Sequence, residues 1–246
     1  MSKPTIVLVH GAFADSSSWN PVIAELSAKG YTVIAAANPL RGVKSDASYV
    51  ASVVRSIKGP VVLVGHSYGG MVISNAATGV ANVKSLVYVA AFAPDKGESA
   101  FALSVQFPGS TLGPALAPPV VLADGANDLY IQQDKVPAQF AADVPVAEAK
   151  RMAVTQRPVT EAALNEASGE AAWKSIPSWF IYGELDKNIP AAAVEFMAKR
   201  AGARKAIAMR GASHVVMLSH PKEVARLIEE AAKAAEQVGA PVGTAD

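Results

Sequence analysis

Residues 60–70 read PVVLVGHSYGG. The first five are apolar and mostly β-branched, which predicts a buried strand, and a helical pattern follows the glycines. Gly65 and Gly69 flank Ser67 at minus two and plus two, where a Cβ would collide with neighbouring backbone in a sharp turn from strand to helix. A glycine-rich connection with an incidental serine is the simpler interpretation. The strand before the turn and the helix after it favour a nucleophilic role for Ser67.

Five further apolar runs share the character of the run before Ser67, and helical patterns separate most of them. None alternates polar with apolar residues, which is typical of a parallel sheet covered by helices on both faces. The sequence therefore predicts a doubly wound α/β fold with a mostly parallel sheet of about six strands. The predicted strands are Thr5–Val9, Tyr31–Ala35, Pro60–Val64, Val83–Ala91, Ser178–Tyr182 and Lys205–Met209.

Capping signals give the approximate ends of several helices. Ser17 or Ser18 is available to cap the first helix, and Gly79 marks the end of the third. The closing helix starts at Pro221, a residue suited to a first helical turn. The final stretch, residues 237–246, is rich in Gly, Ala and Pro and is predicted to be disordered.

Residues 94–173 interrupt the alternation of strands and helices. This segment is far too long for one crossover and is rich in proline, and loops of such length inside a domain are usually functional. We interpret it as a cap inserted into a core formed by residues 1–93 and 174–236. Its second half is expected to be mostly helical, which makes the cap mainly helical.

Composition limits the classes of protein and partner. The 246 residues are 51% hydrophobic and 17% charged, which suits one large domain. Lys and Arg total 22 against 21 Asp and Glu, so neither a nucleic acid nor an anionic membrane is an expected partner. A small-molecule substrate and a monomer or homodimer are expected. The chain lacks cysteine, dinucleotide and phosphate motifs and metal-ligand clusters, so no metal or organic cofactor is expected.

The first residues and the hydropathy pattern bear on location. The apolar run that begins at Thr5 is too short for the core of a signal peptide and lacks a small-residue cleavage site. No apolar run approaches the length of a membrane span. A cytoplasmic protein is therefore expected.

A serine nucleophile needs a base, which in this type of fold follows the serine in the chain. His10 and His66 precede Ser67 and are expected to shape the first loop and the turn. His214 follows the sixth predicted strand through a short loop, which would deliver it to the carboxyl edge of the sheet. His220 precedes a proline at a helix start, where a packing or capping role is favoured. His214 is the predicted base.

The acid that orients the base should also follow a strand. Residues 178–186 read SWFIYGELD, a buried strand followed by a glycine turn and two acids. Asp186 is preferred to Glu184 because it lies deeper in the loop, just before the Ile189-Pro190 pair that opens the next helix. Asp95, just past the fourth strand, is the alternative. An ordinary turn aspartate is the simpler interpretation of Asp186.

Three motifs together resemble the α/β-hydrolase superfamily, and within it the plant methylesterase and hydroxynitrile lyase group with its bacterial esterase relatives. They are residues 10–12 (HGA) with Trp19 downstream, residues 65–70 (GHSYGG) and residues 213–221 (SHVVMLSHP). The similarity spans nearly the whole chain and weakens in the cap.

This resemblance implies the α/β-hydrolase fold and a triad of Ser67, Asp186 and His214. It also implies an oxyanion hole formed by the backbone N–H groups of Ala12 and Tyr68. The chain departs from the lyases of the best-studied branch, which have a lysine after the catalytic histidine and a threonine after the first histidine. Here Val215 and Gly11 occupy those positions, so cyanohydrin cleavage by that route is not expected.

The predicted chemistry is hydrolysis of a small hydrophobic or aromatic carboxylic ester through an acyl-enzyme on Ser67. A cofactor-free perhydrolase or lyase using the same triad, or a hydrolase-like receptor with little turnover, would share these motifs. Apolar residues of the cap and the rim are predicted to line the pocket beside Tyr68, although each of them is equally consistent with ordinary core packing. These residues are Phe13, Phe92, Phe101, Leu103, Phe107, Met152 and Met217.

Overall fold

The computed structural model describes residues 3–238 and contains a six-stranded sheet. The strand order is β2-β1-β3-β4-β8-β9, and all neighbouring strands are parallel. This arrangement confirms the predicted α/β fold class, because parallel neighbours require crossover connections. The strands are β1 (Thr5–Val9), β2 (Val33–Ala36), β3 (Val61–His66), β4 (Val83–Val89), β8 (Ser178–Gly183) and β9 (Lys205–Met209).

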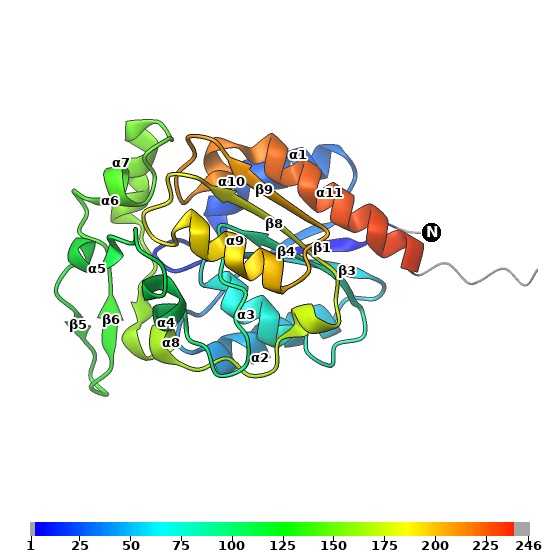
Figure 1. Cartoon of the computed structure of the whole chain (residues 1–246), viewed down its shortest axis with the longest axis horizontal. Coiled ribbons are helices and arrows are strands. Elements are labelled where there is room, and N and C mark those ends of the chain that lie inside the picture. Colours follow the sequence, from blue (N-terminus) through cyan, green and yellow to red (C-terminus); the bar gives the residue numbers. More distant parts are fainter. Residues whose placement is uncertain (1–2, 239–246) are drawn as a thin grey trace, which may run out of the picture.

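Helices cover both faces of the sheet (Figure 1). On one face α11 packs on β3, β4 and β8, and α1 packs on α11. On the other face α3 packs on β1, β3 and β4, and α2 packs on α3. The α9 helix contacts β8 and β9. The bounds are α1 (Asn20–Ala28), α2 (Val43–Arg55), α3 (Gly69–Ala76), α9 (Ala191–Arg200), α10 (Val216–Ser219) and α11 (Pro221–Val238), and the short 3-10 helix η1 (Ser16–Trp19) precedes α1.

The central strands form the core. Every residue of β3 and β8 is buried, whereas the edge strand β9 is exposed or half-buried along its length. This explains why the β3 run lacks alternation, since both of its faces lie under helices. The β4 strand ends at Val89, two residues before the predicted end, because Ala90 adopts a positive φ of 43° that breaks the extended backbone.

Two predicted helix ends differ from the structure. Asp15, not Ser17 or Ser18, caps the first turn, because its carboxylate accepts the backbone N–H of Ser17 at 2.8 Å. The closing helix α11 continues to Val238, so it includes the first two residues of the predicted tail. The remaining tail residues, 239–246, lie outside the described residues. Within residues 3–238, no helix has both the length and the apolarity to cross a bilayer.

Most of residues 94–173 lie beside one end of the main sheet (Figure 1). They contain a second, antiparallel sheet of order β5-β6-β7, which the sequence analysis missed. Its strands have two or three residues, too few for a periodic pattern to be recognised. The elements are α4 (Ala100–Val105), α5 (Leu112–Ala115), β5 (Val120–Val121), β6 (Asn127–Leu129), α6 (Val136–Gln139), α7 (Val146–Val154), β7 (Val159–Thr160), α8 (Glu161–Asn165) and the 3-10 helix η2 (Ala172–Lys174).

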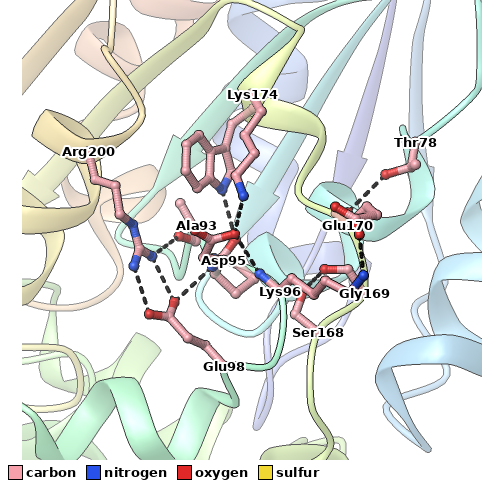
Figure 2. A network of polar contacts seen from close by, with 12 residues as sticks. Thr78, Ala93, Asp95, Lys96, Glu98, Ser168, Gly169, Glu170, Lys174 and Arg200 are labelled. Carbon is pink, nitrogen blue, oxygen red and sulfur yellow. Dashed lines mark hydrogen bonds and ion pairs between the residues drawn. The ribbon is translucent and has the colours of Figure 1, made fainter.

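The two ends of this inserted segment lie side by side and are joined by a polar network (Figure 2). The Trp173 indole N–H donates to the Pro94 carbonyl oxygen at 2.7 Å, and the Lys174 ammonium lies 2.5 Å from the Asp95 carboxylate. Arg200 of α9 donates to both carboxylate oxygens of Glu98 at 2.7 and 2.8 Å. The network thus attaches both ends of the insertion to the core.

Candidate active site

Ser67 lies at the turn between β3 and α3 in a strained conformation, with a φ of 53°. A Cβ at Gly65 would lie 2.7 Å from the Gly69 carbonyl oxygen, and one at Gly69 would lie 2.4 Å from the Val9 carbonyl oxygen. Larger residues would therefore force the backbone apart at both positions. The strain is typical of functional sites, and it holds the serine side chain at the wall of a cavity.

His214 and Asp186 form a buried pair. The His214 Nδ1 lies 2.6 Å from the Asp186 Oδ2, and both side chains are almost fully inaccessible. The second carboxylate oxygen of Asp186 accepts the backbone N–H groups of Asn188 at 2.7 Å and Ile189 at 3.0 Å. These bonds orient the carboxylate, which in turn orients the imidazole ring.

The other nitrogen of His214 has no hydrogen-bond partner among the described residues. His214 and Ser67 line the same cavity. A neutral imidazole that donates through Nδ1 to a carboxylate keeps Nε2 as an acceptor, which is the form that a general base requires.

The alternative acid and base residues lie elsewhere. Asp95 pairs with Lys174 in the network of Figure 2, and that hydrogen bond lowers the pKa of the Asp95 carboxyl group. Glu184 is exposed. His220 is half-buried, and its Nε2 lies 3.8 Å from an Asp143 carboxylate oxygen. Among the acids considered, Asp186 is the one that contacts His214.

The candidate oxyanion-hole residues Ala12 and Tyr68 line the cavity together with Ser67. The loop that carries Ala12 is held by His10, whose Nδ1 donates to the Gly11 carbonyl oxygen at 2.9 Å and whose Nε2 accepts the Asn38 backbone N–H at 3.0 Å. Burial lowers the pKa of His10, in agreement with this neutral form. His10 therefore shapes the loop, as the sequence analysis expected.

His66 makes a contact that the sequence analysis missed. Its Nε2 donates to the backbone carbonyl oxygen of His214 at 3.1 Å, and the two ring centroids are 4.7 Å apart. Burial, followed by the nearby charge of His214, holds the pKa of His66 well below its usual value. No signal in the sequence reveals this contact, because the two residues are 148 positions apart.

The cavity has a volume of about 440 Å³ and lies between the core and the inserted segment. Of the predicted substrate-binding residues, Phe13, Phe92, Phe101 and Phe107 line it. No charged side chain from residues 3–238 lines it. Its walls also include Ala100, Ser104, Val105, Pro108, Gly109, Ser110, Leu112, Gly113, Pro114, Leu116, Phe140, Leu164, Asn188 and Ile189.

Three residues predicted to line the pocket lie outside it, and each position corrects the prediction. Leu103 lies on the buried face of α4 and packs into the core. Met217 is fully buried in α10. Met152 lies on α7 and borders a different hollow, between α7 and the loop after Phe13. Leu103 and Met217 fill space between elements, which local sequence does not distinguish from lining a cavity.

Phe140 is the main wall residue that sequence reasoning overlooked. Its ring centroid lies 5.0 Å from that of His214 and 6.3 Å from that of Phe13, and its side chain is buried. It packs an apolar surface against the candidate base.

Nowhere in the described chain is a group of three His, Asp or Glu side chains arranged to hold a metal ion.

Comparison with known proteins identifies the family to which this fold belongs. The family model described as "Alpha/beta hydrolase family" matches residues 6–227, so the chain belongs to that family. This confirms the resemblance seen in the motifs.

Named relatives come from a fungus, a bacterium and a plant. The alpha/beta hydrolase nvfD of Aspergillus novofumigatus is 28% identical over 262 residues, covering 97% of this chain and 100% of that protein. A carbendazim hydrolyzing esterase of a Nocardioides species is 36% identical over 110 residues, covering 39% of this chain and 46% of the esterase. The alpha-hydroxynitrile lyase of Arabidopsis thaliana is 24% identical over 251 residues, covering 90% of this chain and 94% of the lyase. Among solved structures, polyneuridine aldehyde esterase has a TM-score of 0.80 at 20% identity, covering 93% of this chain and 99% of the esterase.

Proposed function

We propose that this protein is a serine hydrolase that cleaves a small hydrophobic or aromatic carboxylic ester. The observation that carries the proposal is the 2.6 Å contact between His214 and Asp186. His214 lines the same cavity as Ser67, which lies in a strained turn. The combination of nucleophile, base and orienting acid is the arrangement that nucleophilic acyl transfer requires.

In this mechanism Nε2 of His214 takes the proton of the Ser67 hydroxyl as Oγ bonds to the ester carbonyl carbon. Asp186 holds the imidazole and stabilises the imidazolium that forms. The backbone N–H groups of Ala12 and Tyr68 donate to the oxyanion of the tetrahedral intermediate. Collapse of the intermediate breaks the bond to the alcohol, which leaves with the proton from His214. Water activated by His214 then releases the acid and regenerates Ser67.

The residues of the cavity wall favour a neutral, apolar substrate. Five phenylalanines line the cavity, and within residues 3–238 no Lys or Arg lines it that would hold a carboxylate or a phosphate. A neutral ester would bind by burying apolar surface, whereas its carboxylate product would find no cationic partner and would be released. Residues 94–173 supply much of the wall, which supports their role as a cap that selects the substrate. The esterase relative from Nocardioides is consistent with ester chemistry.

Cyanohydrin cleavage by the route of the best-studied lyases is disfavoured by the geometry around Gly11, although a lyase is among the relatives. A Cβ at Gly11 would lie 2.6 Å from the Ser67 Cβ and 2.9 Å from the His66 carbonyl oxygen. The threonine that the best-studied lyases place here therefore has no room in this backbone. Esterase activity is the function that this arrangement supports best.

The test uses a fluorophosphonate probe and p-nitrophenyl acetate and butyrate. Wild type should be labelled and should hydrolyse both esters, and Ser67→Ala should lose labelling and lower kcat/KM by at least about a thousandfold. Ser85→Ala is the matched control. This serine is also buried, but its hydroxyl donates to the Ala231 carbonyl oxygen of α11, the helix that packs on β4. Equal activity of Ser67→Ala and Ser85→Ala would disprove the proposal.

A further inference from the structure

Asp46 is a fully buried carboxylate that the proposed mechanism does not use. It lies in the first turn of α2. Its oxygens accept the backbone N–H groups of Arg41 at 3.1 Å and of Gly42 at 3.4 Å. Burial raises the pKa of Asp46, and these hydrogen bonds act in the opposite direction. A carboxylate is unfavourable in the interior unless such donors surround it, so its position here needs an explanation.

The remaining donor to Asp46 comes from the nucleophile turn. The Tyr68 hydroxyl donates to the Asp46 Oδ2 at 2.9 Å, and both side chains are buried. Tyr68 follows Ser67 directly and is the N-cap residue of α3. The same residue therefore lines the cavity and supplies a candidate oxyanion-hole N–H from its backbone, and Asp46 anchors the end of its ring.

The loop that donates to Asp46 also carries part of the inserted segment. Thr160 of β7 donates its backbone N–H to the Leu40 carbonyl oxygen at 3.1 Å and its hydroxyl to the Arg41 carbonyl oxygen at 2.9 Å. The Arg41 side chain reaches Asp128 of β6 at 2.6 Å. Asp46 thus links the turn at Ser67 to the loop on which the small sheet rests.

We propose that Asp46 is a positioning residue for the oxyanion hole, holding Tyr68 so that its backbone N–H faces the reacting carbonyl. This inference rests on the proposed hydrolase function. The turn at Ser67 is strained and persists only where its surroundings fix it from several sides. A small displacement of an oxyanion donor weakens stabilisation of the transition state more than binding of the substrate. The expected signature is a loss in kcat with KM nearly unchanged.

The decisive comparison is Tyr68→Phe against Tyr88→Phe. Tyr88 is also fully buried, and its hydroxyl lies 2.8 Å from the Ser74 Oγ, but it sits on β4 and does not line the cavity. Both variants remove one buried hydroxyl. Rates are normalised to the concentration of active sites that the fluorophosphonate labels. Tyr68→Phe should then lower kcat about tenfold. It should also raise the inhibition constant Ki of phenylboronic acid by a similar factor. Tyr88→Phe should change neither value.

Asp46→Ala tests whether the carboxylate acts through Tyr68. It should lower kcat in wild type and add little in the Tyr68→Phe background, because the contact is already missing there. If Asp46→Ala does not fold, the comparison of Tyr68→Phe with Tyr88→Phe still tests whether the Tyr68 hydroxyl contact positions the oxyanion hole. A Tyr68→Phe enzyme with the kcat and boronate affinity of Tyr88→Phe would overturn this inference alone. A wild type that hydrolyses no ester would overturn the proposed function and this inference together.

Discussion

The Nε2 of His66 lies 3.1 Å from the carbonyl oxygen of His214, so the residue before the nucleophile supports the backbone of the candidate base. Beside this contact, Asp186 bonds the ring of His214 and Phe140 packs against it. His214 is therefore held by one contact to its backbone and two contacts to its ring.

Asp186→Asn should lower kcat by about three to four orders of magnitude with little change in KM, because an amide in place of the carboxylate favours the wrong imidazole tautomer and cannot stabilise the imidazolium. Steady-state kinetics on p-nitrophenyl butyrate measure the effect. Asp95→Asn is the control, since Asp95 pairs with Lys174 away from His214. A large loss in Asp95→Asn, with Asp186→Asn active, would reverse the assignment of the acid.

The free energy of unfolding should fall as the pH drops from 7 to 5. Burial lowers the pKa of His10 and of His66 in the folded protein, so the unfolded chain binds protons below about pH 6.5 that the folded state does not. The stability that depends on these two neutral histidines is thus fully present above that pH. It is lost as the pH falls, by at most about 1.4 kcal/mol per pH unit for each histidine.

Urea titrations at pH 7, 6 and 5 measure this slope. His66→Gln should reduce the slope, because glutamine does not titrate in this range, and the remaining slope should come from His10. A free energy of unfolding that stays constant over this interval in wild type would contradict a neutral, buried pair of histidines.

Phe140→Ala and Phe101→Ala should separate structural from binding roles in the cavity wall. Phe140 is 1% exposed, so its truncation should lower the free energy of unfolding by about 3 to 5 kcal/mol. Phe101 is 55% exposed, so its truncation should cost less than about 1 kcal/mol while raising KM for an aromatic ester. Equal loss of stability in both variants, measured by urea unfolding, would contradict the different burial of the two rings.

Arg200→Met should destabilise the protein by about 2 kcal/mol, because the guanidinium makes a two-point contact with Glu98 and donates to the Ala93 carbonyl oxygen (Figure 2). Lys96→Met is the control, since the nearby pair of Lys96 with Glu170 is exposed and should contribute nothing measurable. Chemical denaturation measures the free energy of unfolding of both variants. A larger loss in Lys96→Met than in Arg200→Met would contradict this prediction.

The main sheet was predictable because its signals are local. An unbroken apolar run such as residues 61–64 indicates a strand buried on both faces, whichever distant helices come to cover it. The turn at Ser67 was equally readable, since only glycine fits beside it. Asp186 and His214 could be chosen because each follows a strand, and the carboxyl ends of parallel strands meet at one edge.

The walls of the cavity could not be predicted in the same way. Phe107 and Leu103 are similar in character and only four positions apart, yet one lines the cavity and the other packs into the core. The difference depends on how the inserted segment lies against the core, which no local pattern encodes.

The sequence by itself thus determined the order of the strands along the chain, the strained turn and the identity of the residues that reach the edge of the sheet. Tertiary structure alone decided which phenylalanines face the cavity, that His66 supports His214, and that Asp46 anchors Tyr68. The physical reason is distance along the chain. Strands and turns form from neighbouring residues, whereas these contacts join segments that meet only when the whole chain is packed.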